Sequence, residues 1–155
     1  MGEYVLGESQ RQKLNDSSVE VFGTMYYTPI ELLPDMPAQE QWNLEEQYVR
    51  TVIEYRGPHT ANMEFFFPKS LAVNIAGGFL GVDDESLSDE QTIDTMREAT
   101  NMIIGNFLGR IDPDGACKLG VPSAEVVSDF SPDNCPTGHV VAFMSDFGFL
   151  WMMFD

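Results

Sequence analysis

Apolar and polar positions alternate along this chain with two periods, and each period predicts one kind of element. In residues 89–108 apolar or buried-type side chains recur every three or four positions, at Ile93, Met96, Thr100, Ile103, Ile104 and Phe107. This spacing predicts a long helix with one buried face. Ser88 followed by Gln91 has the spacing of a capping box at its start, and Gly109 is well placed to end it.

A second long helix is predicted to begin at Asp16. Ser17 and Glu20 have capping-box spacing there, and apolar residues recur at helical intervals until Pro29 closes the helix. Residues 1–15 are polar and are interpreted as a lead-in to the folded part of the chain.

Period-two alternation and β-branched residues predict five strands, at residues 48–55, 60–67, 123–130, 139–146 and 149–154. The first two and the last two are joined by turn residues into hairpins. An apolar stretch at 69–80 predicts a short helix, and segments 31–45, 82–88 and 110–120 are interpreted as loops. Hairpins in place of alternating strand–helix units favour an α+β fold, with two long helices and a short one packed on a mostly antiparallel sheet.

Composition narrows the choice of partners. The 155 residues fit one domain over residues 16–155, and 25 acidic against 8 basic residues give a net charge of −17. Nucleic acid and anionic membranes are therefore disfavoured as partners. A polar N-terminus and the lack of any apolar run of roughly 20 residues indicate a soluble, cytoplasmic protein. Cys117 and Cys135 are interpreted as two thiols in a reducing compartment, with one bridge as the alternative.

The helix over residues 89–108 also carries a second line of residues on the flank away from its apolar stripe, namely Asp94, Glu98, Asn101 and Gly105. Asparagine inside a helix lowers helix propensity, yet on periodicity alone a solvated polar face is the simpler interpretation. His59 and His139 lie in turn-like contexts, and Asp112-Pro-Asp-Gly lacks the other ligands of a calcium loop. We therefore expect no metal site.

A resemblance to a known family favours a functional role for these polar residues over a solvated polar face. The run from Asp94 to Asn106 contains Glu-x-x-Asn on a predicted helix, and Pro122 follows after a loop. Together with VFGTM at 21–25, FPKSLAVNIAGGFLG at 67–81 and the acidic loop before the motif helix, it resembles the CheX branch of the CheC/CheX/FliY family of chemotaxis phosphatases. The similarity extends over roughly residues 16–130 and implies a CheC-like fold.

The resemblance implies that the chain is a phosphatase acting on the aspartyl phosphate of a CheY-type response regulator receiver domain. Asn101 matches the family amide that orients the attacking water, and Glu98 matches the acid that pairs with a lysine of the partner. Asp94, Met102, Gly105 and Pro122 are assigned to the surrounding partner-binding surface, with Met102 on an exposed flank. No cofactor of its own is expected, because Mg²⁺ belongs to the receiver domain.

Two further expectations concern assembly and activity. The apolar segments 63–67 and 149–154 are costly to leave at an exposed sheet edge, so we expect a homodimer through sheet edges. Glu20 is followed three residues later by Gly23 rather than by an amide, so only one site is expected. The alternative function is a non-catalytic CheX-like binding or dimerisation module of a signalling complex, which the lifetime of a phosphorylated receiver domain would distinguish.

Overall fold

The computed structural model of the chain describes residues 7–38, 41, 46–58, 60–128, 130–132 and 140–154. Within these ranges the elements in chain order are α1 (Glu8–Met25), β1 (Glu31–Leu32), β2 (Tyr48–Arg56), β3 (Ala61–Pro68), α2 (Lys69–Leu80), the 3-10 helix η2 (Asp84–Ser86), α3 (Asp89–Ile111), β4 (Lys118–Leu119), β5 (Ser123–Val127), β6 (Val140–Ser145) and β7 (Gly148–Phe154).

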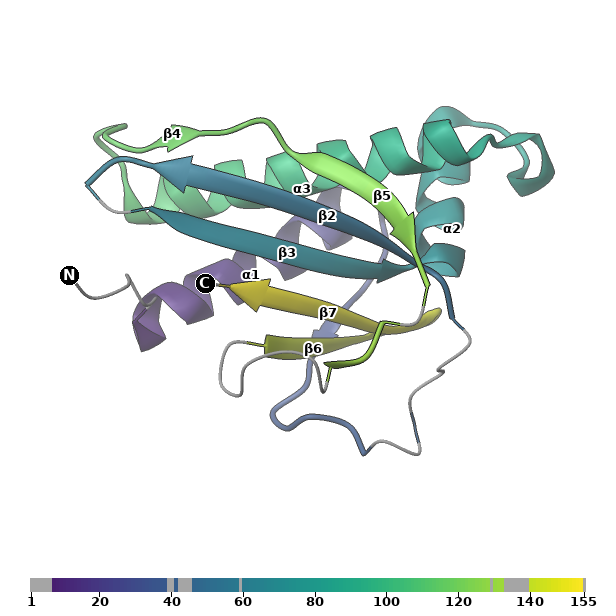
Figure 1. Ribbon diagram of the computed structural model, residues 1–155, viewed down its shortest axis with the longest axis horizontal. Helices are drawn as coiled ribbons and strands as arrows, with labels where there is room; N and C mark the ends of the chain where they lie inside the picture. The colour runs from purple at the N-terminus through teal and green to yellow at the C-terminus, as the bar shows by residue number, and fades with distance from the viewer. Residues whose placement is uncertain are drawn as a thin grey trace.

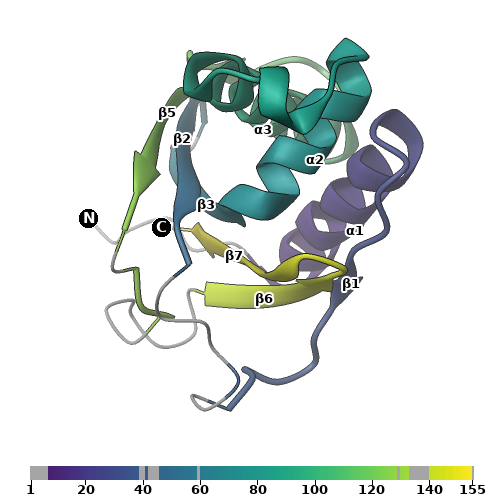
Figure 2. The ribbon, with the colours of Figure 1, turned by 90° about the vertical axis from the view of Figure 1, so that its right-hand side faces the viewer.

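The strands form one sheet in the order β1-β6-β7-β3-β2-β4, and β5 also pairs with β2. Each pairing between described strands is antiparallel. The last strand, β7, lies beside β3 in the middle of the sheet (Figure 1). All three α-helices lie on one face of the sheet, which curves around them (Figure 2). The predicted α+β fold with a mostly antiparallel sheet is thus confirmed.

Alternation along the central strands separates two apolar clusters. Side chains that face the helices form the main core, and its fully buried strand members include Val49, Ile53, Tyr55, Met63, Phe65, Phe67, Leu150 and Met152. The opposite face of the sheet carries a smaller buried cluster of Tyr48, Phe66, Ala142 and Trp151. The helices therefore cover the face that holds most of the core.

The first helix begins at Glu8, which corrects the predicted start at Asp16. Residues 8–15 belong to α1 rather than to the polar lead-in proposed for residues 1–15, and residues 1–6 lie outside the described residues. Most of the added residues, 8–15, are good helix formers. Leu14 is completely buried in the main core, so tertiary packing stabilises a stretch whose sequence looks merely polar.

The start of α1 is closed by Gln10, whose Oε1 accepts a hydrogen bond from the backbone N–H of Gly7 at 3.2 Å. Ser17 and Ser18 therefore lie inside the helix and are buried, instead of one of them capping it. The Ser18 hydroxyl donates to the carbonyl oxygen of Leu14 at 2.9 Å, which satisfies a polar group in an otherwise apolar contact.

The long helix α3 runs through Gly109 and ends at Ile111, so the prediction that Gly109 ends it is wrong. The backbone N–H of Asp112 continues the helical pattern by donating to the carbonyl oxygen of Leu108 at 2.8 Å. The Asp112 carboxylate then accepts the backbone N–H of Cys117 at 2.6 Å. This side chain, rather than the glycine, turns the chain away from the helix axis.

Smaller differences concern the loops. The segments expected to be irregular at 31–45 and 110–120 contain the two-residue strands β1 and β4, and the strand expected over 123–130 ends at Val127. The acidic loop over 82–88 contains η2. The short strands β1, β4 and β5 pair with strands far along the chain, and local patterns do not encode such pairings.

The two apolar segments that led us to expect a sheet-edge dimer lie in the middle of the sheet. β3 and β7 pair with each other, with Met63 opposite Phe154 and Phe66 opposite Trp151. Neither strand presents an open edge, so the premise of that expectation is wrong. Among the described strands the edges are β1 on one side and β4 with β5 on the other, and each is short.

Candidate functional site

The candidate residues lie on α3, whose first turn is closed by Ser88 as predicted. Ser88 Oγ accepts a hydrogen bond from the backbone N–H of Gln91 at 3.1 Å. In return, Gln91 Oε1 accepts the backbone N–H of Ser88 at 2.9 Å. Asp89 and Glu90 lie in the first turn, where the helix dipole favours negative charge. The cap defines where α3 begins.

The rotation of α3 about its axis is set by its buried face. Thr51 on β2 and Thr100 place their hydroxyl oxygens 2.6 Å apart, and both side chains are completely buried. The Thr100 hydroxyl donates to the Met96 carbonyl oxygen at 3.0 Å, so the Thr51 hydroxyl donates to Thr100. Because breaking a buried hydrogen bond is costly, this contact holds the helix with Glu98 exposed and Asn101 half-buried at its surface.

Glu98 and Asn101 are available for an external partner. Within the part of the chain that the structure describes, neither side chain makes a hydrogen bond or an ion pair. Asp94, by contrast, pairs with Arg97 at 2.5 Å, and Asn106 Oδ1 accepts a hydrogen bond from an arginine Nε at 3.0 Å. The middle of α3 thus offers a carboxylate and an amide that are both unengaged, a single helical turn apart.

Gly105 continues the same face beyond Asn101. It is exposed, and a Cβ placed on it would meet nothing within 4 Å, so packing within this chain does not require a glycine there. Its effect is to leave the helix surface open for a close approach by another molecule. Pro122 is half-buried on the loop before β5, a strand that packs against α3, and its neighbour Val121 is 91% exposed.

Met102, predicted on an exposed flank, is half-buried and packs against the main core. Tyr26, the residue that caps the end of α1, donates a hydrogen bond from Oη to Met102 Sδ at 3.7 Å. Burial, and to a smaller extent the negative charge of Glu98, raise the pKa of Tyr26 above its ordinary value. The phenol therefore lies at the junction of the two long helices, beside the carboxylate of the candidate site.

The sequence analysis did not identify Tyr26 as part of this site. Tyr26 is one of the residues that recur at helical intervals before Pro29, and its partner Met102 is 76 positions away. The available signal was chemical, because a tyrosine within an apolar stripe must bring its hydroxyl to a polar neighbour. That signal does not say where in the fold the neighbour lies.

A second link joins the last turn of α3 to α1. Arg110 on α3 pairs with Glu20 of α1 and also donates to Asn106. Glu20, interpreted from the sequence as a capping or surface acid, is thus engaged by α3. Gly23, three residues later on α1, supplies no side-chain amide.

Other reactive residues do not extend the site. Among the described residues, no group of three or more His, Cys, Asp or Glu side chains is arranged to hold a metal ion. His59, His139 and Cys135 lie outside the described residues. Burial and the neighbouring Asp112 carboxylate raise the pKa of the Cys117 thiol, which disfavours the reactive thiolate. In the described part of the chain, no helix has the length and apolar character to cross a membrane.

The geometry is suited to chemistry on another macromolecule. The Glu98 carboxylate can bind a cationic group, and the Asn101 amide can donate one hydrogen bond while it accepts another. Glu98 is exposed and Asn101 is half-buried at the surface of the helix. They can therefore act together in a cleft that a partner supplies.

Comparison with known proteins gives a family and a fold. The family model described as chemotaxis phosphatase CheX matches residues 49–140, a range that includes all of α3 and Pro122. No individually curated protein sequence matches the chain.

Among solved structures, the chemotaxis protein CheX from Vibrio vulnificus has a TM-score of 0.73 and 19% identity, covering 95% of this chain and 99% of that chain. A CheC-like superfamily protein from Shewanella sp. PV-4 has a TM-score of 0.68 and 20% identity, with coverage of 97% and 99%. The CheX–CheY–BeF3–Mg²⁺ complex from Borrelia burgdorferi has a TM-score of 0.65 and 15% identity, covering 94% of this chain and 96% of that chain. These similarities show a shared fold.

Proposed function

The chain belongs to the family of the chemotaxis phosphatase CheX, and from this membership we propose that it hydrolyses the aspartyl phosphate of a CheY-type response regulator receiver domain. A protein with the same fold was crystallised as a complex of CheX with CheY, BeF3 and Mg²⁺. The observation on this chain that carries the proposal is the pair of Glu98 and Asn101, which are exposed or half-buried on α3 and unengaged by any described residue.

Asn101 is assigned to the attacking water. In an in-line displacement the water oxygen bonds to phosphorus while the bond from phosphorus to the aspartyl carboxylate oxygen breaks. The carboxylate leaves with the bonding electron pair, and a proton of the water passes to the phosphate product. An acyl phosphate is already activated, so the main requirement is positioning. A neutral amide positions the water without repelling the phosphoryl group, whereas a carboxylate would repel it.

Glu98 is assigned to a lysine of the receiver domain. It is exposed and lies one helical turn before Asn101, so it can reach the partner at the same time as the amide. In this proposal Mg²⁺ is part of the phosphorylated receiver domain, and neither side chain acts on it directly. Asp94, Gly105 and Pro122 are assigned to the contact surface around the pair.

The decisive variant is Asn101→Ala, compared with Asn106→Ala as a matched control on the same helix. Asn106 already bonds to Arg110, so its loss leaves the proposed water position intact. With a bound, phosphorylated receiver domain under single-turnover conditions, Asn101→Ala should lower the rate constant by roughly 10²-fold or more, as when one transition-state contact is deleted. Asn106→Ala should hydrolyse the phosphoryl group at the wild-type rate.

Docking separates this proposal from the alternative function. Asn101→Ala should bind the receiver domain nearly as tightly as wild type, whereas Glu98→Lys should weaken binding by placing like charges together. If Asn101→Ala hydrolyses as fast as wild type, or if wild type binds without shortening the lifetime of the phosphoryl group, the chain is a non-catalytic binding module.

The proposal extends to assembly and location. The family resemblance also implies a homodimer through sheet edges, so we predict a dimer through an edge strand, β1 or β5, and light scattering at micromolar concentration should give twice the chain mass. The receiver domain as partner places the activity in the cytoplasm.

A further inference from the structure

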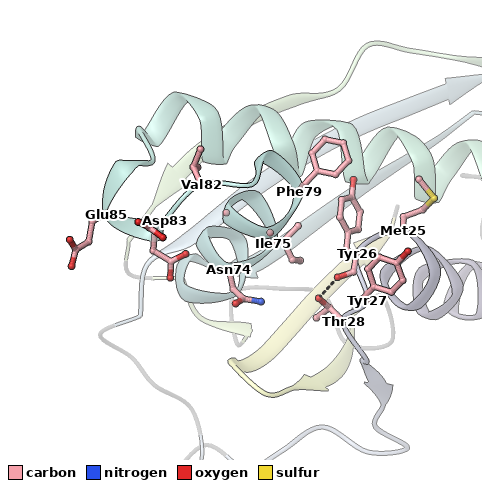
Figure 3. Close-up of a pocket in the computed structure, with 13 residues that line it drawn as sticks. Met25, Tyr26, Tyr27, Thr28, Asn74, Ile75, Phe79, Val82, Asp83 and Glu85 are labelled. Carbon is pink, nitrogen blue, oxygen red and sulfur yellow. Dashed lines mark hydrogen bonds between the residues drawn. The ribbon is translucent and has the colours of Figure 1, made fainter.

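A groove of about 1000 Å³ lies between the end of α1, α2 and η2. One part of its wall is aromatic and exposed, with Tyr27 at 87% and Phe79 at 59% of their full accessibility. Another part is acidic, formed by Asp83, Asp84 and Glu85. Figure 3 shows Tyr27 at the end of α1, Phe79 of α2 beside Tyr26, and the acidic side chains of Asp83 and Glu85 beyond α2. Exposed apolar surface rimmed by charge is typical of an interaction site.

The aromatic part is held in place by the backbone. Tyr27 has a φ of 52°, a left-handed conformation that is unusual for a bulky residue. Two hydrogen bonds from Thr28 close the turn around Tyr27. The Thr28 hydroxyl donates to the Tyr26 carbonyl oxygen at 2.9 Å, and the Thr28 N–H donates to the Phe22 carbonyl oxygen at 2.9 Å. The fold therefore presents this side chain to solvent at a conformational cost.

Tyr26 links the groove to the neighbourhood of the candidate site. Tyr26 lines the groove, and its ring meets Phe79 edge-on with ring centroids 5.8 Å apart. The hydroxyl of the same side chain bonds to Met102 and lies within the electrostatic reach of Glu98. A macromolecule seated on Glu98 and Asn101 can consequently reach the groove past Tyr26.

The charge of the groove limits its occupant. Asp83, Asp84 and Glu85 are exposed, and within the described residues none of them forms an ion pair. The described residues that line the groove include no lysine or arginine. A second copy of this chain, with its net charge of −17, would be repelled on average, whereas an apolar side chain flanked by lysine or arginine would be attracted.

We propose that this groove is a second contact surface for the receiver domain, and that it binds an apolar side chain with an adjacent lysine or arginine. The inference rests on the proposed function, because it takes the same partner. Receiver domains that share a phosphorylated aspartate and a lysine differ on their outer surfaces, so a contact away from the phosphoryl group selects among them. The groove thus determines which receiver domain is dephosphorylated.

The test measures docking apart from chemistry. Phe79→Ser and Asp83→Lys are compared with Val19→Ser and Asp16→Lys, which are the matched changes on the surface of α1. The probe is a CheY-type receiver domain from the same genome that carries beryllofluoride and Mg²⁺. Each groove change should raise the dissociation constant about tenfold, and each control less than about twofold. With the phosphorylated receiver domain in place of the beryllofluoride form, the single-turnover rate constant for hydrolysis at saturation should stay at the wild-type value.

Tyr27→Gly supplies a variant that retains the backbone, because glycine adopts a positive φ without strain. It should remain folded by circular dichroism and weaken docking as Phe79→Ser does. If the groove variants bind like wild type while wild type removes the phosphoryl group, the groove proposal is overturned and the proposed function stands.

Two other results are distinguishable from that one. If wild type neither binds nor dephosphorylates any receiver domain of the genome, the proposed function itself fails. If Phe79→Ser converts a wild-type dimer into a monomer, the groove joins two copies of this chain and the proposal is overturned.

Discussion

Tyr26 shows how a single side chain connects distant parts of this molecule. Its hydroxyl is half-buried between a thioether, which is a weak acceptor, and the nearby Glu98 carboxylate. Burial and, to a smaller extent, the charge of Glu98 favour the neutral phenol and raise the pKa of Tyr26, so the folded protein holds this proton more tightly than the unfolded chain, where the pKa is near 10.0. The resulting stabilisation is present below pH 10 and is lost as the pH rises above that value.

Tyr26→Phe removes this titration and should flatten the alkaline limb of the stability curve. Between pH 9 and pH 11 the free energy of unfolding of wild type should fall more steeply than that of the variant. Tyr48, whose pKa burial also raises, titrates in both proteins and cancels in the comparison. Denaturant unfolding at several pH values gives the two curves, and parallel curves would contradict the prediction.

At the scale of one element, α3 is held at its start, middle and end. The Ser88 cap closes its first turn, Thr100 bonds to the sheet, and Arg110 pairs with α1. Glu98 and Asn101 of the proposed site lie on either side of the second of these contacts along the helix. A rigid helix is a precise support for a group that must orient a water.

Ser88→Ala should lower the free energy of unfolding by about 1 kcal/mol, because it leaves the Gln91 backbone N–H without its acceptor. Ser86→Ala is the control, since Ser86 is exposed and its side chain bonds to no described residue. The control should change stability by less than about 0.5 kcal/mol. Chemical denaturation measures both changes, and equal losses in the two variants would argue against the cap.

At the scale of the whole molecule, charge opposes compactness. The acidic side chains, which give the 155 residues a net charge of −17, repel one another. The ion pairs that offset this repulsion are partly exposed at the surface. Exposed pairs contribute little to stability, so self-repulsion dominates the effect of salt. The same excess of acid favours partners with lysine and arginine on their surface.

Sodium chloride should therefore raise the melting temperature at pH 7. Screening lengths fall from about 30 Å at 0.01 M to about 10 Å at 0.1 M, so most of the increase should occur over that range. Differential scanning calorimetry at a series of salt concentrations tests this. A melting temperature that falls as salt is added would mean that the ion pairs outweigh the repulsion.

Local pattern was sufficient for much of the fold and for the proposed pair. The Ser88 cap, the strands β2 and β3, the short helix α2 and the final hairpin were all predicted from neighbouring residues. The exposed position of Glu98 on α3 also followed from periodicity. These features depend on hydrogen bonds and side-chain directions within a few residues, which a sequence states directly.

Other features required contacts between distant residues. The early start of α1 depends on the burial of Leu14, and the pairing of β3 with β7 removed the expected apolar edge. The contact of Tyr26 with Met102, which joins the groove to the site, has no local signal. Periodicity indicates which face of an element is apolar. The element that packs against this face depends on the total burial of the folded chain, because no short stretch of sequence determines it.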